Sequence, residues 1–221
     1  MLKIWGRPTS ICTQRVLWAC AEAGLEYSFQ LASATMGAEG HISTGAEPFG
    51  SVDTDWYRRM NPNGTVPTID DDGFQLWESN AIVGYLARRY ASEQLFDNDE
   101  GVFARGWQWL SWTNERLEPL LHTLVMEVVR LRADMRSAAA LAEAREALKT
   151  PVAILEEHLA GQSYVAGEAF SMGDIAPGAT LYRSQLLDSF PMGFPHVERW
   201  LNRLQQRPGF IRHVAPRECH I

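Results

Sequence analysis

Short apolar and alternating segments mark the first third of the chain and predict an opening β-α-β unit. Residues 2–5 predict a first strand, and residues 26–31 alternate between apolar and polar positions as a second strand would. The residues between them have helical spacing, and Gly24 is well placed to end that helix. A connection of this kind is expected to be right-handed. The expected buried face of the helix consists of Val16, Leu17, Cys20 and Ala23.

A hairpin and a helix are predicted before residue 90. The apolar run at residues 66–69 favours a buried strand, the Asp-Gly sequence within residues 70–73 favours a turn, and residues 74–77 form the return strand. Ser79 stands just before a stretch of helical apolar spacing, so we expect it to be the N-cap of a helix that ends near residue 90.

The remainder of the chain shows only helical periodicity. Residues 100–130 predict a long helix that Pro119 should kink or break, and residues 137–159 predict another with a possible kink at Pro151. Residues 196–207 form a last amphipathic segment. The sequence 208–210, Pro-Gly-Phe, is expected to close the helical pattern, and the Ser-x-x-Asp sequence of Ser171 and Asp174 predicts a capping box before a buried helix.

These patterns divide the chain into two domains. We expect an α/β domain at residues 1–90, a linker at 91–96 and an all-helical domain at 97–221. Residues 32–53 are rich in Gly, Ala, Ser and Thr without a clear period, and residues 53–60 suggest one or two helical turns. A loop of this length is usually functional or mobile. Its role stays open between a surface insertion, an active-site lid and a dimer element.

Composition, charge and the absence of certain motifs argue against several classes of function. The chain has 221 residues, is 46% hydrophobic and carries a net charge of −7, which argues against nucleic acid or an anionic membrane as a partner. Three cysteines without a Cys-x-x-Cys motif and six scattered histidines predict neither a disulfide framework nor a metal site. No apolar run is long enough to span a bilayer, and the start does not read as a signal peptide, so a cytoplasmic protein is expected. Motifs of serine hydrolases, nucleotide-binding loops and zinc proteases are missing.

The hairpin region has the properties of a binding site for an amino acid or peptide. Pro67 cannot donate to a sheet, and a cis Val66–Pro67 bond would leave the Val66 backbone groups able to pair with an extended ligand. Ser79 combines a hydroxyl with free N–H groups at a helix start, which suits a carboxylate. Glu78 beside it can accept from an ammonium group.

This order of Val-Pro strand, hairpin and Glu-Ser helix start resembles the glutathione-binding half of the glutathione transferases. The resemblance covers nearly the whole chain and is weakest at residues 33–52 and after about 213. It implies a thioredoxin-like N-terminal domain followed by an all-α domain, and glutathione as co-substrate. It also implies that Asn63 contacts the glycine carboxylate, and it assigns the Ser171 capping box to stability. The glutathione-binding positions implied in the hairpin are Val66, Pro67, Glu78 and Ser79.

The family reaction requires glutathione as its thiolate. A free thiol with a pKa near 8.5 is only ~3% ionised at pH 7. The resemblance places the catalytic side chain of serine-type and cysteine-type members at Ser10, between the first strand and the first helix, with Thr9 as an adjacent candidate. There is no tyrosine at this point for the tyrosine-type mechanism. Cys12 is the rival, because a helix start favours a thiolate that could form a mixed disulfide, although it could equally be a small packed residue.

The leading hypothesis is therefore a cytosolic glutathione transferase that conjugates the thiolate to a small apolar electrophile. Alternatives are a thiol-disulfide reductase or peroxidase that uses Cys12, a glutathione-dependent isomerase, and a non-enzymatic module that retains the fold. The resemblance implies a homodimer. It also places the second substrate between the domains, where Trp112 and Arg116 could line the pocket, although core packing and a solvated face are the simpler interpretations of these two residues. The sequence does not identify the electrophile.

Overall fold

A computed structural model describes residues 1–33, 36–37, 40–41 and 50–215 of the chain. Its N-terminal part contains a four-stranded sheet in the order β2-β1-β5-β6. Strands β1 and β2 are parallel, whereas β5 pairs antiparallel with both β1 and β6. The strands are β1 (Leu2–Gly6), β2 (Tyr27–Leu31), β5 (Thr68–Asp71) and β6 (Phe74–Trp77), and a separate small pair consists of β3 (Met36–Gly37) and β4 (Gly40–His41).

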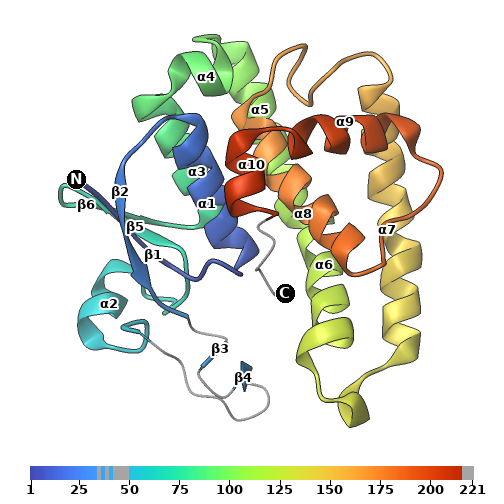
Figure 1. The fold of residues 1–221 in the computed structure, drawn as a ribbon, viewed down its shortest axis with the longest axis horizontal. Coiled ribbons are helices and arrows are strands. Elements are labelled where there is room, and N and C mark those ends of the chain that lie inside the picture. The colour runs from blue at the N-terminus through green and yellow to red at the C-terminus, as the bar shows by residue number, and fades with distance from the viewer. Residues whose placement is uncertain (34–35, 38–39, 42–49, 216–221) are drawn as a thin grey trace.

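Strand alternation in β1 gives the sheet two apolar faces. Ile4 points into the main core, where α1 (Ile11–Glu22) and α3 (Ser79–Tyr90) pack together against the sheet (Figure 1). Its neighbour Trp5 points the other way and packs with Tyr57 of α2 (Asp55–Met60) in a smaller cluster. The predicted α/β thioredoxin-like arrangement is therefore confirmed.

The remainder of the described chain is helical, as expected. It begins with a short helix at residues 92–96, inside the stretch expected as a linker. The helices are α4 (Ser92–Phe96), α5 (Glu100–Arg116), α6 (Glu118–Val125), the π-helix η2 (Met126–Arg130), the 3-10 helix η3 (Ala133–Met135), α7 (Ala138–Leu159), the 3-10 helix η4 (Met172–Asp174), α8 (Ile175–Leu186), α9 (Pro195–Gln205) and α10 (Pro208–His213).

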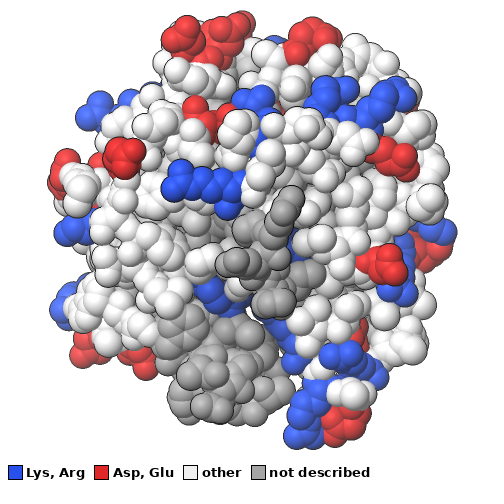
Figure 2. Space-filling view, in the orientation of Figure 1, with Lys and Arg blue, Asp and Glu red and all other residues white. Residues whose placement is uncertain are grey.

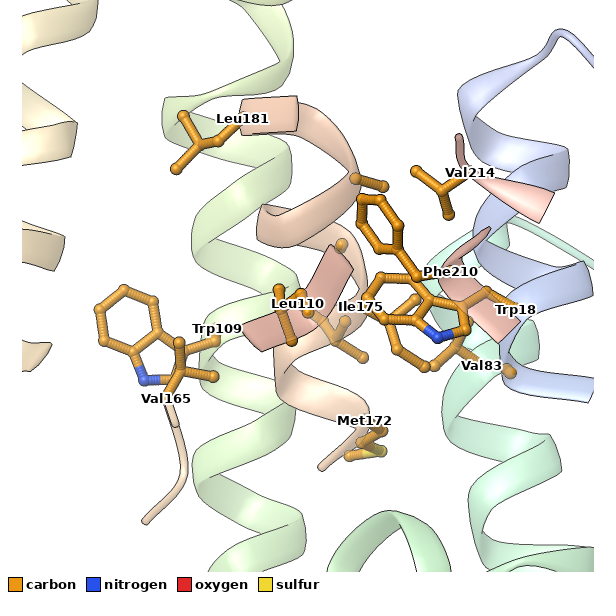
Figure 3. Packing of buried hydrophobic residues seen from close by; sticks show 14 of the residues in the cluster. Trp18, Val83, Trp109, Leu110, Val165, Met172, Ile175, Leu181, Phe210 and Val214 are labelled. Atoms are coloured by element: carbon orange, nitrogen blue, oxygen red, sulfur yellow. The ribbon is translucent and has the colours of Figure 1, made fainter. Parts of the chain in front are cut away.

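Helix α1 joins the two parts through one hydrophobic core. Its Trp18 is fully buried and packs edge-on against Phe210 of α10 with a centroid distance of 5.0 Å (Figure 3). The ring also lies 5.6 Å from Phe170. Gly209 permits this approach, because a Cβ there would come within 2.8 Å of the indole. The core is thus continuous from the sheet to the C-terminal helices.

The sequence around Pro119, Pro151 and Pro208 was expected to kink, break or end the helices. The expected break at Pro119 is confirmed, since α5 ends at Arg116 and Pro119 lies in the first turn of α6. The expected kink at Pro151 does not end α7, which continues through this buried residue. Residues 208–210 do not close the pattern, because Pro208 begins the further helix α10.

The cap of α3 also differs from the expectation. The N-cap is Glu78, which makes no side-chain capping bond, and Ser79 is the first helical residue. The capping box of Ser171 and Asp174 is present as predicted.

The proposed roles of the loop at 32–53 fall largely on residues outside those described. On the face drawn in Figure 2, basic and acidic side chains are interspersed.

Candidate functional site

A cavity of about 330 Å³ lies between the N-terminal domain and helix α6. Six of the predicted site residues line it, whereas Thr9, Asn63, Trp112 and Arg116 are not among its lining residues. The wall from the N-terminal domain consists of Arg7, Ser10, Ile11, Cys12, Thr65, Val66, Pro67, Glu78 and Ser79, and the helical wall consists of Glu118, Leu121, His122, Val125 and Arg130.

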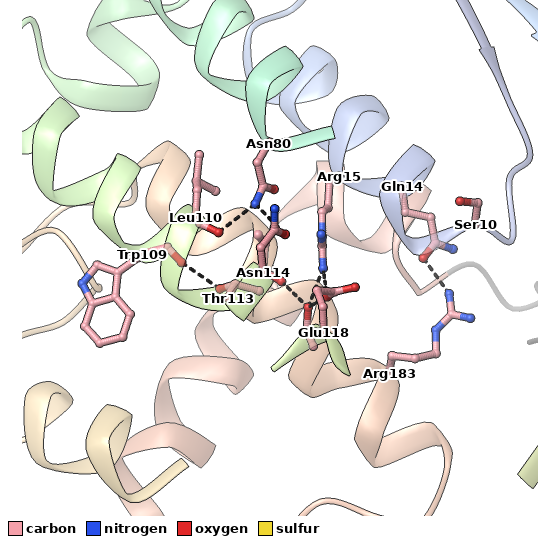
Figure 4. Close-up of polar contacts among 12 residues, drawn as sticks. Ser10, Gln14, Arg15, Asn80, Trp109, Leu110, Thr113, Asn114, Glu118 and Arg183 are labelled. Atoms are coloured by element: carbon pink, nitrogen blue, oxygen red, sulfur yellow. Dashed lines mark hydrogen bonds and ion pairs between the residues drawn. The ribbon is translucent and has the colours of Figure 1, made fainter. Parts of the chain in front are cut away.

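Ser10 is held at the N-terminus of α1. It is the N-cap residue, and its Oγ accepts a long hydrogen bond of 3.4 Å from the Thr13 N–H. The preceding loop is fixed because Gln14 Nε2 donates to the Pro8 carbonyl at 2.9 Å and Arg183 of α8 donates to Gln14 Oε1 at 2.8 Å (Figure 4). Since the hydroxyl only accepts in this cap, its proton stays available to a ligand in the pocket.

Cys12 lies in the first turn of α1 and also lines the pocket. Burial raises the pKa of its thiol above the usual value, although Arg15 and a hydrogen bond from Ser79 act in the opposite direction. Burial therefore acts against the Cys12 thiolate that the helix start was expected to favour.

The Val66–Pro67 peptide bond is cis, as expected, and both residues line the pocket. The Val66 backbone makes no hydrogen bond with the other residues that the structure describes, since β5 begins only at Thr68. The preceding turn is fixed by Asn61, whose Nδ2 donates to the Thr65 carbonyl at 2.9 Å. Asn63 is not among the lining residues, and its Nδ2 donates to Asn61 Oδ1 at 3.1 Å.

Glu78 and Ser79 stand side by side at the start of α3. Glu78 has a backbone φ of 70° and ψ of 113°, a conformation that typically costs a non-glycine residue about 1–3 kcal/mol and that clusters at functional sites. Its carboxylate accepts no hydrogen bond from the described residues and is exposed at the pocket. Ser79 brings a hydroxyl and one of the free N–H groups of the first helical turn. The next residue, Asn80, is turned away and donates to the Leu110 carbonyl of α5 at 2.8 Å.

A buried ion pair beneath the pocket was not predicted. Arg15 of α1 is 1% exposed and pairs with Glu118, which lines the cavity from α6 (Figure 4). Arg15 also donates to Thr180 Oγ1 of α8 at 2.6 Å. The only signal in the sequence is an arginine within the buried apolar run of α1, because its partner is 103 positions away.

The described part of the chain contains neither a metal-binding cluster nor a membrane-spanning helix. No group of three or more His, Cys, Asp or Glu side chains in residues 1–33 and 50–215 is arranged to hold a metal ion. Within the same residues no helix combines the length and apolarity needed to cross a bilayer.

Comparisons with known proteins agree with this geometry. The family model for the glutathione S-transferase N-terminal domain matches residues 9–89, and the model for the C-terminal domain matches residues 117–208. Glutathione S-transferase GstB of Escherichia coli strain K12 is 32% identical, with 97% of this chain and 98% of that protein covered.

The chain belongs to the glutathione S-transferase family. A crystal structure of the theta class glutathione S-transferase of Xanthomonas axonopodis pv. citri with glutathione bound superimposes with a TM-score of 0.83. It is 35% identical, and the alignment covers 97% of both chains. The apo form of that protein gives a TM-score of 0.78 at 31% identity. In this transferase the family fold thus brings Ser10, Val66, Glu78 and Ser79 to one cavity, although they are separated in sequence.

Proposed function

We propose that the protein binds glutathione in this cavity, activates it as a thiolate and conjugates it to a small, largely apolar electrophile. The observation that carries the proposal is the convergence of Ser10, Val66, Glu78 and Ser79 on one pocket whose opposite wall is helix α6. A cytoplasmic location is part of the proposal. Cys12 and Cys20 are both free, which suits a reducing compartment.

Each pocket residue has a group that fits one part of glutathione. The hydroxyl and helix-start N–H of Ser79 suit the carboxylate of the γ-glutamyl end, and the unpaired carboxylate of Glu78 suits its ammonium group. The Val66 backbone can pair with the extended peptide. This placement directs the cysteinyl sulfur toward the start of α1, where Ser10 stands.

Ser10 supplies the catalytic hydrogen bond in this proposal. Its hydroxyl donates to the sulfur and stabilises the thiolate over the thiol, so that the pKa of the bound thiol falls. A decrease of two units from 8.5 gives roughly 75% thiolate at pH 7. The sulfur then attacks the electrophilic carbon, a C–S bond forms, and the leaving group departs with the bonding electron pair.

The reductase alternative is less well supported than the transferase. It needs Cys12 as a thiolate, because the thiolate is the nucleophile in disulfide exchange. Burial instead raises the pKa of this thiol. Cys12 is better interpreted as a packed residue at the edge of the site.

The test is an ultraviolet titration of the thiolate absorbance of bound glutathione against pH. We expect the wild type to lower the pKa of the bound thiol, and Ser10→Ala to raise it again by about 1–2 units, because one charge-assisted hydrogen bond is lost. Cys12→Ala serves as the matched control and should leave the pKa of bound glutathione unchanged, since burial raises the pKa of the Cys12 thiol. A pKa that depends on Cys12 alone would support the redox alternative, and no binding of glutathione would refute both.

We also include a homodimer in the proposal. Phe74 of the edge strand β6 is 48% exposed and stacks on Tyr85 of α3, and Trp107 of α5 is 42% exposed nearby against Gly84. Exposed aromatic surface shared by both domains is typical of an interface. Phe74→Glu is therefore expected to convert a dimer to a monomer in size-exclusion chromatography with light scattering. Leu186 of α8 is equally exposed, and Leu186→Glu should leave the dimer intact. A Phe74→Glu variant that stays dimeric would exclude the surface around Phe74 and Trp107 as the dimer interface.

A further inference from the structure

The helical wall of the pocket ends in a change of helix type. Glu118, Leu121 and Val125 repeat with α-helical spacing along the face of α6 that lines the cavity. From residue 126 the chain forms the π-helix η2, in which the Leu131 N–H donates to the Met126 carbonyl, five residues back, at 2.9 Å. Such π segments are rare and occur frequently at functional sites.

The π turn decides which side chain extends the pocket wall. In a continuing α-helix the position after Val125 on this face would be Val129. Because a π turn contains more residues, Arg130 lines the cavity instead, and Val129 packs against the hydrophobic core. The change of helix type therefore exchanges an apolar lining residue for a cation.

Arg130 is not neutralised by the residues that the structure describes. It is half-buried and has neither a hydrogen bond nor an ion pair within residues 1–33 and 50–215. Burial lowers the pKa of its guanidinium. By contrast, the interior arginines Arg15 and Arg207 are paired with Glu118 and Glu22. A partly desolvated guanidinium without a partner is a site for a planar anion such as a carboxylate.

The neighbours of Arg130 set the shape of the ligand. Leu121 and Val125 give the same wall an apolar surface, and Ile11 faces them from α1. The groups assigned to the γ-glutamyl end of glutathione, Glu78 and Ser79, belong to the opposite wall. An electrophile that fills the space between the walls thus meets these apolar side chains along its body and the Arg130 guanidinium at the end of the helical wall. Apart from Glu78, the other charged lining residues are engaged elsewhere, since Arg7 donates to Ser33 and Glu118 pairs with Arg15.

We propose that Arg130 makes this transferase selective for electrophiles that carry a carboxylate on an apolar, aromatic-sized body. The inference rests on the proposed function and names the substrate class of the same site. In the reaction the guanidinium binds the carboxylate and orients the molecule. The thiolate attacks the carbon that bears the leaving group, the C–S bond forms, and the halide leaves with the bonding electrons.

A matched pair of substrates tests the inference. We would measure kcat/KM for glutathione with 4-fluoro-3-nitrobenzoate and with its neutral counterpart 4-fluoro-3-nitrobenzamide, each corrected for the uncatalysed rate. Arg130→Gln is expected to lower kcat/KM for the benzoate by about 10- to 100-fold, because a charge-assisted pair is lost, and to change the value for the benzamide by less than about 2-fold. Arg130→Lys should fall between the wild type and Arg130→Gln, because it retains the charge without the planar fork.

Arg132→Gln is the control for general charge effects. Arg132 is exposed, pairs with Asp134 and lies outside the pocket, so its removal should change neither substrate's rate. An equal loss on both substrates in Arg130→Gln would overturn the inference, because Arg130 would then act on glutathione itself. A loss on neither substrate would overturn it as well.

A binding measurement separates this inference from the transferase activity. Calorimetry in the presence of S-methylglutathione would compare the affinities of the enzyme for two unreactive ligands, 3-nitrobenzoate and 3-nitrobenzamide. If the wild type catalyses neither reaction, the proposed activity fails for this class, yet tighter binding of the benzoate that Arg130→Gln abolishes still supports the selectivity. Equal binding of the two ligands by the wild type would refute the selectivity even if conjugation occurs.

Discussion

Replacement of Asp174 by alanine is expected to destabilise the protein by about 4 kcal/mol, because several buried donors lose their acceptor at once. The carboxylate is completely buried, and burial raises its pKa. Its Oδ1 accepts from the Val165 N–H at 3.0 Å and from Trp200 Nε1 at 2.8 Å, and its Oδ2 accepts from the Ser171 N–H at 2.9 Å. One side chain therefore connects the start of η4, the preceding loop and α9.

Urea unfolding would measure this loss as a change in midpoint at constant m value. Asp174→Asn should be milder, because its carbonyl oxygen can still accept from Val165 and Trp200 while only the Ser171 cap is lost. Asp99→Ala removes an N-cap of the same residue type at the exposed start of α5 and should cost far less. A loss in Asp174→Ala no larger than in Asp99→Ala would show that the buried network contributes little.

Replacement of Glu118 by alanine is expected to cost about 3 kcal/mol of stability and to lower transferase activity as well. The change leaves the Arg15 guanidinium buried without its counter-charge, and Arg15 Nε already has no hydrogen-bond partner among the described residues. Thr180 cannot replace the carboxylate, because a hydroxyl carries no charge. Activity should fall because Glu118 forms part of the pocket wall.

A double-mutant cycle distinguishes an orphaned charge from a simple loss of packing. The variant Arg15→Met with Glu118→Met replaces the pair by apolar side chains and should be more stable than Glu118→Ala alone, since no buried charge remains. Unfolding free energies from urea titrations would be compared across the single and double variants. If the losses of stability in the two single variants add up to the loss in the double variant, the pair makes no net contribution to the contact between α1 and α6.

Local patterns in the sequence predicted much of the fold and part of the site. The strand spacing placed β1, β2 and β6, whereas β5 begins at Thr68, two residues later than the apolar run indicated. The order of Pro67, Glu78 and Ser79 indicated a binding surface, and these residues do line the cavity. The assignment of Asn63 as a ligand stays a prediction, because Asn63 is not among the lining residues and its side chain donates to Asn61 within the turn. That competition between neighbouring amides has no signature in residue types.

The residues that were missed depend on long-range packing or on helix register. Glu118 meets Arg15 only after α6 packs near α1, and the sequence separation of 103 residues hides this contact. Arg130 enters the pocket because of a π turn, and apolar periodicity alone predicts that Val129 would occupy the position. Both residues bear charges whose surroundings become known only from the folded chain.

Helix α1 lies within the first 90 residues and packs with α3, yet it also packs on the C-terminal part of the chain, since its Trp18 contacts Phe170 and Phe210. A fragment that ended at residue 90 would present this indole to water and would be prone to aggregate. The two parts of the chain must therefore fit each other around Trp18. A gene fusion that joined the first half of one family member to the second half of another would have to preserve the fit around a single tryptophan before it could form a working pocket.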